Sequence, residues 1–126
     1  MAQLTQQLAP QQYPLPGVST TGATAAEILR IDIPSNGILA LEYTVTAQRT
    51  DGTFGRAAFT RKVYAGNNGG TVSVNIENAI GTDYNPNTYT GPTHAAAGSG
   101  TAGLIVSVAG AASTPLKWAI SYRAMI

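Results

Sequence analysis

The sequence predicts an all-β fold, an antiparallel β-sandwich or a jelly-roll-like barrel that carries an extended amino-terminal arm. Several short segments alternate apolar and polar residues with a period of two, which is typical of strands. Turn residues such as Gly, Asn, Asp and Pro separate these segments, and no helical period lies between them. The chain has 126 residues, which suits one domain. We place the arm at residues 1–26 and the sandwich at residues 27–126.

Residues 1–26 are predicted to be an arm because they contain no charged side chain and are rich in Gln, Thr, Pro and Gly. The prolines at positions 10, 14 and 16 fix the backbone and remove N–H donors, so no helix runs through this part of the chain. Solvated disordered tails are usually rich in charge, which favours docking on a neighbouring subunit over a floppy terminus. The candidate partner-binding residues of the arm are Leu4, Leu8, Tyr13, Leu15 and Val18.

The carboxyl-terminal segment shows the plainest strand pattern. Leu116, Trp118 and Ile120 face one way and Lys117 faces the other. An apolar chain end would be a liability if it were left open, so we expect residues 125–126 to be packed in the core or on a neighbour. The strands predicted by alternation cover residues 27–33, 39–48, 54–65, 71–77, 104–108 and 116–126.

The segment that follows the glycine-rich turn at residues 66–70 also alternates cleanly. Val72, Val74 and Ile76 are predicted to share one face, and Glu77 is predicted to lie on the other. A strand with one buried and one solvated face follows from this pattern.

Residues 78–100 are predicted to form a long irregular segment because six Gly and Pro residues interrupt them. Loops of this length in a compact domain are usually functional or disordered. Tyr84 and Tyr89 stand there among small polar residues, which is the composition of binding loops. We name both as candidate partner-binding residues, and a loop that shields a sheet edge is an equal alternative.

The charge content excludes several partner classes. Charged residues make up 10% of the chain, against about 25% in a typical soluble domain. Because interface cores are depleted in charge, this composition favours a surface that partners cover. The net charge is +1 and no run of Lys and Arg exists, so no nucleic-acid partner is expected. No apolar stretch is long enough to span a bilayer, and the start of the chain does not resemble a signal peptide.

The sequence offers few groups for catalysis. His94 is the sole histidine and is expected to be a solvated or interface residue of a loop. No Gly-x-Ser-x-Gly motif is present, and one histidine without cysteine cannot build a zinc site. Glu42 and Glu77 could flank a cleft as in a glycosidase, but two solvent-facing strand residues are the simpler interpretation. We expect no enzymatic activity, no catalytic residue, no cofactor and no metal site.

Five short motifs together resemble a β-domain that recurs in virion proteins of tailed bacteriophages. Those domains tend to show an Arg-x-Asp-Gly hairpin, an aromatic-basic strand and a Gly-Gly-Thr turn, and then a Val-x-Gly-Ala-Ala turn before a strand that carries Trp. The matching segments are residues 46–52 (TAQRTDG), 57–62 (AAFTRK), 69–72 (GGTV), 103–112 (GLIVSVAGAA) and 116–120 (LKWAI). The resemblance covers about residues 38–126.

The resemblance implies a structural role in a virion, with no catalytic residue to carry over. The chain is short and shows no fibrous shaft ahead of the domain, which favours a capsid decoration or cement protein assembled in the host cytoplasm. A tail-fibre or head-fibre receptor-binding protein and a tail or neck adaptor are the alternatives. The expected partners are the major capsid protein or other virion proteins, and further copies of the chain in a homo-oligomer, trimer or dimer.

Overall fold

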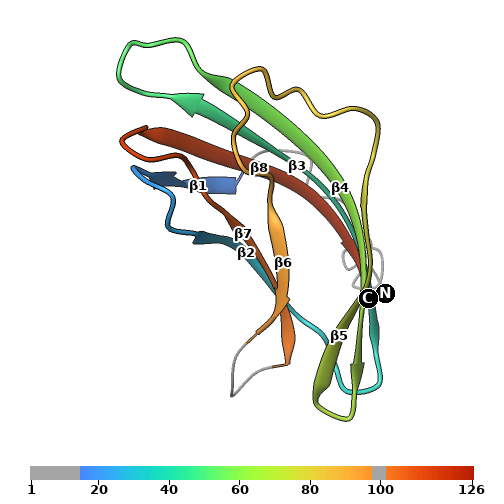
Figure 1. Cartoon of the computed structure of the whole chain (residues 1–126). Coiled ribbons are helices and arrows are strands. Elements are labelled where there is room, and N and C mark those ends of the chain that lie inside the picture. The colour runs from blue at the N-terminus through green and yellow to red at the C-terminus, as the bar shows by residue number, and fades with distance from the viewer. Residues whose placement is uncertain (1–14, 98–101) are drawn as a thin grey trace.

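A computed structural model describes residues 15–97 and 102–126, and these residues form an all-β structure of two antiparallel sheets (Figure 1). One sheet has five strands in the order β1-β8-β3-β4-β5, and the other has three in the order β2-β7-β6. This confirms the predicted β-sandwich. The described residues include no helix, and so none able to cross a membrane. The strands are β1 (Leu15–Thr20), β2 (Ala26–Asp32), β3 (Ile38–Arg49), β4 (Arg56–Asn68), β5 (Thr71–Ala79), β6 (Thr93–Ala96), β7 (Gly103–Val108) and β8 (Leu116–Met125).

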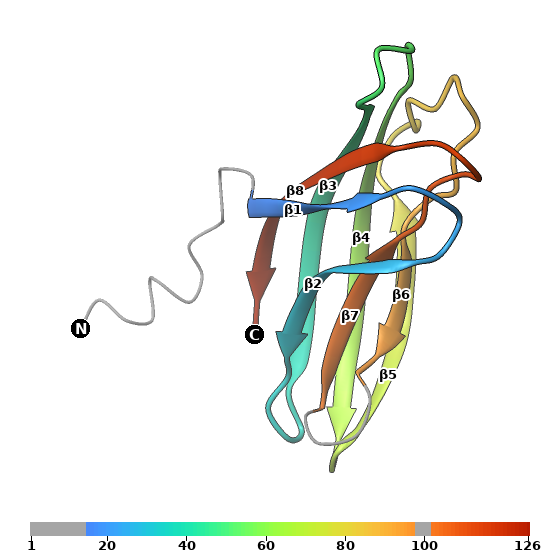
Figure 2. The ribbon, with the colours of Figure 1, turned by 90° about the vertical axis from the view of Figure 1, so that its left-hand side faces the viewer.

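The core lies between the two sheets. The five-stranded sheet is curved, and β2, β7 and β6 cover its concave side (Figures 1 and 2). Alternate side chains of each strand point into the gap, as the period of two predicts. The rings of Phe59 and Trp118 stack there with their centroids 6.4 Å apart. The largest fully buried side chains are Trp118, Tyr43, Phe59, Leu39, Leu41, Leu104, Leu116, Ile120, Val45, Val63, Val106 and Val108.

Strand β1 corrects the predicted boundary of the arm. Residues 15–20 were expected in the arm, but they pair antiparallel with β8 of the same chain. The indole Nε1 of Trp118 donates a buried hydrogen bond of 2.9 Å to Oγ1 of Thr20, which holds β1 to the sheet. Gly17 allows the close approach, because a Cβ at this position would lie 1.5 Å from the carbonyl oxygen of Trp118. The sandwich therefore begins at Leu15, before residue 27.

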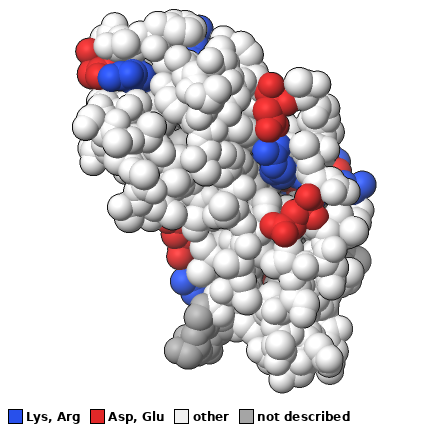
Figure 3. Space-filling model, in the orientation of Figure 1, with Lys and Arg blue, Asp and Glu red and all other residues white. Residues whose placement is uncertain are grey.

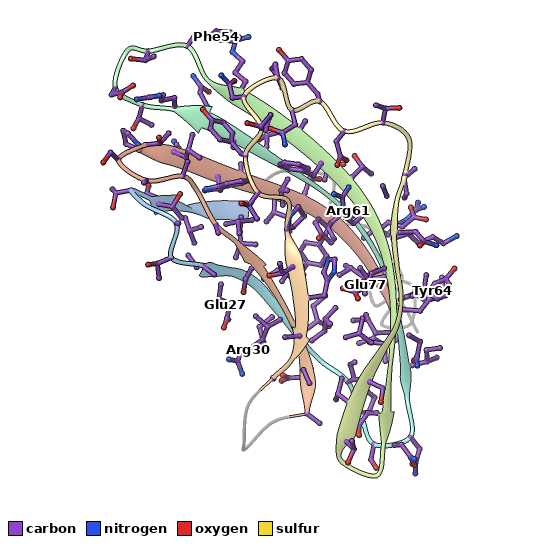
Figure 4. All side chains as sticks on the ribbon, in the orientation of Figure 1. Glu27, Arg30, Phe54, Arg61, Tyr64 and Glu77 are labelled. Carbon is purple, nitrogen blue, oxygen red and sulfur yellow. The ribbon has the colours of Figure 1, made fainter. Side chains whose placement is uncertain are left out.

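A β-bulge in β5 corrects the predicted facing of that strand. Tyr64 pairs with Ile76, but the next residue of β4, Ala65, pairs with Val74, so the ladder skips Asn75. The skip reverses the alternation. Val74 faces the core side with Ala65, whereas Ile76 lies on the solvent side with Tyr64. Figure 4 shows Tyr64 and Glu77 on opposite sides of the five-stranded sheet.

The segment at residues 78–100 is more regular than expected. Strand β5 continues to Ala79, and residues 93–96 form β6, which pairs with β7. Between them, Tyr84 forms an antiparallel bridge with Ala58, and their backbone hydrogen bonds measure 2.8 and 3.0 Å. The loop therefore covers the edge of β4 beyond the end of β5.

The carboxyl-terminal residues are not packed in the core. Met125 pairs with Ala40, which lies on the solvent side of the five-stranded sheet, so its side chain faces outward. Met125 and Ile126 are both exposed. Core packing was thus a wrong expectation for this end of the chain, and packing on a neighbour stays a prediction.

Candidate functional site

Two features of the described residues have the character of a site. The first is a cluster of polar side chains at the side of the sandwich where β5 and β6 approach each other, which we call the polar cluster. Figure 4 shows two of its members, Arg61 and Glu77, on the side of the sheet that faces β6. Its members are Tyr43, Arg61, Glu77, Asp83 and His94.

His94 is the centre of the polar cluster. Its Nδ1 lies 2.6 Å from Oε1 of Glu77, and its Nε2 is hydrogen-bonded to the hydroxyl of Tyr43. An ionised carboxylate only accepts hydrogen bonds, so Nδ1 carries the proton and donates to Glu77. In the neutral ring, Nε2 then accepts the hydroxyl proton of Tyr43. The side chain of His94 is only 3% exposed, so His94 is a strand residue with a buried side chain, where a solvated or interface loop residue was expected.

Tyr43 remains a neutral phenol in this environment. Burial raises the pKa of its hydroxyl, and the negative charge of Glu77 acts in the same direction. The positive charge of Arg61 acts the other way without cancelling these effects. The hydroxyl therefore keeps its proton and donates a hydrogen bond to Nε2 of His94.

Arg61 and Asp83 form the second half of the polar cluster. The guanidinium donates two hydrogen bonds to the carboxylate, of 2.7 and 3.0 Å, in the bidentate geometry that favours this pair. The pair lowers the pKa of Asp83 and raises that of Arg61, mainly through these hydrogen bonds. The guanidinium also lies 5.5 Å from the ring centroid of Phe59, so it is held from two sides.

The polar cluster ties the two sheets together. Tyr43 and Glu77 belong to the five-stranded sheet, and His94 belongs to the three-stranded sheet. The buried hydroxyl and imidazole use their hydrogen-bonding atoms on each other and on Glu77. Glu42 does not join Glu77 across a cleft, because it pairs with Lys62 on the solvent side whereas Glu77 pairs with Val63 on the core side.

The second feature lies on the solvent side of the five-stranded sheet, which we call the outer face. Cross-strand pairing places Met125, Ala40, Tyr64 and Ile76 in one line across β8, β3, β4 and β5. Ile38 lies beside them, two residues from Ala40 on the same side of β3. These five residues are the outer row. Apolar side chains that form a continuous exposed patch indicate a contact surface.

The outer row is open to solvent within the described residues. Ile38 is 62% exposed, Met125 is 55% exposed and Ile76 is 39% exposed. Charged residues stand at its border, where Nζ of Lys62 lies 5.4 Å from the ring centroid of Tyr64. An apolar centre with a polar rim is the composition of protein interfaces.

Next to the outer row, the outer face carries a charged line of Arg123, Glu42 and Lys62, and small uncharged side chains lie beyond it. The pairs Thr44–Thr60, Thr46–Ala58 and Thr46–Ala119 carry no charge, and the hydroxyls of Thr44 and Thr60 are 2.9 Å apart. In the side view of Figure 3, the Lys, Arg, Asp and Glu side chains lie in a few small groups separated by uncharged residues.

The structure does not gather the predicted binding residues of the arm into one site. Leu4, Leu8 and Tyr13 lie outside the described residues. Leu15 begins β1, and Val18 packs partly buried against the core of its own chain. For Val18, the expected contact with a neighbour is replaced by a contact inside the sandwich.

The two tyrosines of the 78–100 segment separate. Tyr84 is 52% exposed, as a contact residue should be, whereas Tyr89 is only 8% exposed and belongs to the core. The side chain of Asn85 fixes the turn between them by bonding both the backbone N–H and the carbonyl oxygen of Tyr89. Tyr89 is therefore a structural anchor and not the second aromatic of a binding loop.

A further exposed aromatic lies at the hairpin between β3 and β4. Phe54 is exposed at the tip, where Figure 4 places it, and the guanidinium of Arg56 lies 5.2 Å from its ring centroid. Tyr84 pairs with Ala58, two residues from Arg56 on the same side of β4. This end of the sheet thus carries two exposed aromatic rings.

Sequence reasoning missed the outer row, although part of its signal was readable. Tyr64 lies in the strand predicted at residues 54–65, and Met125 was expected to be packed. The apolar doublet of Ile38 and Leu39 at the start of a strand places an apolar side chain on each face. The outward facing of Ile76 had no such signal, because it depends on the bulge.

Comparisons with known proteins gave one likeness that we describe. No family model and no curated protein matches the sequence. Among solved structures, the chain is similar to part of the tailspike protein of Acinetobacter phage vB_ApiP_P1, with a TM-score of 0.34 and 10% sequence identity. The likeness covers 92% of this chain and 21% of the tailspike chain. We therefore argue function from the residues of this protein alone.

Proposed function

We propose that this protein is a bacteriophage virion structural protein without enzymatic activity, a capsid decoration or cement protein that binds the head shell and clamps neighbouring capsid subunits. The observation that carries the proposal is the outer face of the five-stranded sheet. An exposed apolar row lies there beside the charged line of Arg123, Glu42 and Lys62, and small uncharged side chains lie beyond this line. Such a surface suits extended contact with another protein.

The composition and the resemblance support the same role. Only 10% of the residues are charged. Few ionised groups therefore lose their hydration when a partner covers the surface. The motifs that resemble phage virion domains form the β3–β4 hairpin, the β4–β5 turn and the strands β7 and β8, which together build most of the sandwich.

The proposed mechanism is clamping by a rigid module. The sandwich lies with its outer face over a junction between capsid subunits, and residues 1–14 reach a neighbouring subunit or copy. Each contact is modest, but the symmetry of the shell repeats it and raises the occupancy of all copies. The partners are then the major capsid protein and copies of the chain itself, and the location is the virion.

The first experiment measures copy number in purified particles by quantitative mass spectrometry against the major shell protein. Decoration predicts a nearly stoichiometric ratio. A protein that is absent from particles contradicts the virion role.

A matched pair of variants then tests the outer face. Ile76→Asp should lower occupancy on particles at least about fivefold, because it puts a charge in the contact. Thr93→Asp is the control, since it adds the same charge at an exposed strand position of the other sheet and should keep occupancy near that of the unmodified protein. Equal occupancy of the two variants would exclude the outer row from the contact.

A fibre protein that binds a host receptor is the second candidate, and the exposed rings of Phe54 and Tyr84 favour it. Aromatic side chains give a large contact area for little loss of entropy. This candidate predicts only a few copies per particle and loss of host adsorption in Phe54→Ser with unchanged incorporation. A few copies with normal adsorption of Phe54→Ser would favour a tail or neck adaptor.

A further inference from the structure

We infer that the outer row is the docking surface for the amino-terminal segment of its own chain, residues 1–14, in the free protein. The inference does not depend on the proposed function, because it concerns the protein before it meets any partner. It begins from a surface with no occupant among the described residues. Four strands contribute to that surface, and Met125, Ile38 and Ile76 expose large apolar side chains there.

The place where the segment joins the sandwich favours this surface. The chain enters β1 at Leu15, which pairs with Ile120 of β8. At the other end of β1, the Trp118–Thr20 hydrogen bond of 2.9 Å holds the strand to the sheet. Met125 lies further along the same strand, at most about 17 Å away at the usual rise per residue. Residues 1–14 can span up to about 46 Å, so the whole outer row is within reach.

The chemistry of the segment matches that of the surface. It carries Leu4, Leu8 and Tyr13 and no charged residue. Pro10 and Pro14 have no N–H and cannot donate to a ladder, so side-chain contacts contribute more to binding than in an ordinary added strand. A row of exposed apolar side chains offers that kind of contact.

Tethering selects the segment of the same chain over that of a second copy. A short covalent link gives the attached segment a high effective concentration near the outer row, which a separate molecule at ordinary concentrations does not match. The row is therefore covered while the protein is free, and a partner that binds the row must displace the segment.

Disulfide trapping tests this docking cleanly, because the chain contains no cysteine. Gln7→Cys leaves the apolar residues of the segment intact, and Met125→Cys places the second thiol in the outer row. The control pairs Gln7→Cys with Lys117→Cys, which is also exposed on β8 but lies beyond Ile120 in the direction away from Met125. Lys117 is about 10 Å along the strand from Ile120, and the chain between position 7 and Leu15 is long enough to reach either cysteine.

Docking predicts that the 7–125 disulfide forms within the monomer at least about fivefold faster than the 7–117 disulfide. Equal rates, or a faster 7–117 reaction, would mean that the segment moves freely and would overturn the inference. Disulfide-linked dimers of the 7–125 variant would show that the segment of a second copy occupies the surface. This result would overturn docking within the same chain.

A second readout uses the unmodified surface. Deletion of residues 2–14 should raise the fluorescence of a hydrophobic dye, and Ile76→Ser in the deleted protein should lower it again, because the dye binds the uncovered row. Unchanged dye binding after the deletion contradicts the inference even if particle occupancy behaves as the proposed function requires.

Discussion

The Nδ1 atom of His94 lies 2.6 Å from Oε1 of Glu77, and this contact joins an edge strand of one sheet to an edge strand of the other. The hydroxyl of Tyr43 completes the link from the interior of the five-stranded sheet. The apolar packing between the two sheets is not directional. The polar cluster therefore fixes how β6 sits against β5.

Removal of the imidazole should destabilise the fold. His94→Ala leaves the buried hydroxyl of Tyr43 without its partner, and the free energy of unfolding should fall by about 2–3 kcal/mol. Urea unfolding at neutral pH measures the loss. Thr93→Ala on the same strand is exposed and should change the free energy of unfolding by less than about 0.5 kcal/mol.

A double-mutant cycle isolates the interaction between His94 and Tyr43. Tyr43→Phe removes the hydroxyl that His94→Ala would leave unpaired. The double variant should therefore lose less free energy of unfolding than the sum of the two single losses, by at least about 0.5 kcal/mol. Additive losses would show that the two side chains do not act together.

The bulge at Asn75 should be dispensable for the contact between Glu77 and His94. Deletion of Asn75 alone removes the extra residue and keeps the pairing of Val74 and Ile76 with β4, so Glu77 stays on the core side. Deletion of Asn75 and Ile76 together places Glu77 directly after Val74 and turns it to the outer face. Glu77→Gln should therefore couple to His94→Ala in the free energy of unfolding after the single deletion, but not after the double deletion. Equal coupling in both deleted proteins would show that the register of β5 does not decide this contact.

The Arg61–Asp83 pair should make stability depend on pH at the acidic end. Arg61 lowers the pKa of Asp83 in the folded protein below the ordinary value of about 3.9. A depressed pKa contributes stability that is present above the unfolded value and is lost as the pH falls through the folded value. At pH 7, Asp83→Asn should cost about 1–2 kcal/mol, because Arg61 is left largely buried without its carboxylate.

The pH dependence of the free energy of unfolding tests this prediction for the Arg61–Asp83 pair. The difference in the free energy of unfolding between the unmodified protein and Asp83→Asn should be constant above about pH 5 and shrink from there towards pH 2. Urea unfolding over this range measures it. A difference that stays constant down to pH 2 would show that the pair is not coupled to folding.

The anchoring of β1 should depend on Thr20. Thr20→Val keeps the shape of the side chain but leaves the indole N–H of Trp118 without its acceptor, which should cost about 1–3 kcal/mol. In Thr20→Val, the backbone amides of residues 17–20 should exchange hydrogen faster than those of β3. Ser19→Ala removes a hydroxyl from the other side of β1 and should leave exchange unchanged. Slow exchange in Thr20→Val would mean that the backbone ladder alone holds β1.

Much of the fold could be predicted because alternation reports burial one strand at a time. The strand of Leu39, Leu41 and Tyr43 and the strand of Leu116, Trp118 and Ile120 both bury the residues expected from their patterns. The hairpin at Asp51-Gly52 also joins two strands as expected, with a φ of 86° at Gly52, which glycine adopts without strain.

The errors arose where one element depends on a distant one. Leu15–Thr20 lacks a strand pattern and contains Pro and Gly, yet β8 provides it with a partner. His94 stands in a segment with loop composition, but β7 extends it into a strand and Glu77 and Tyr43 bind its ring. Tyr89 was grouped with Tyr84 by composition, although the turn fixed by Asn85 directs it into the core.

The sequence by itself determined that this protein is all-β, where most of its strands lie and how little charge its surface carries, because these properties follow from residue type and from a period of two along the chain. Only the tertiary structure decided which faces of those strands meet. One skipped residue, Asn75, puts Ile76 in the outer row and Glu77 beside His94. Local alternation cannot report this outcome, because the register of a bulge is a property of two strands paired together.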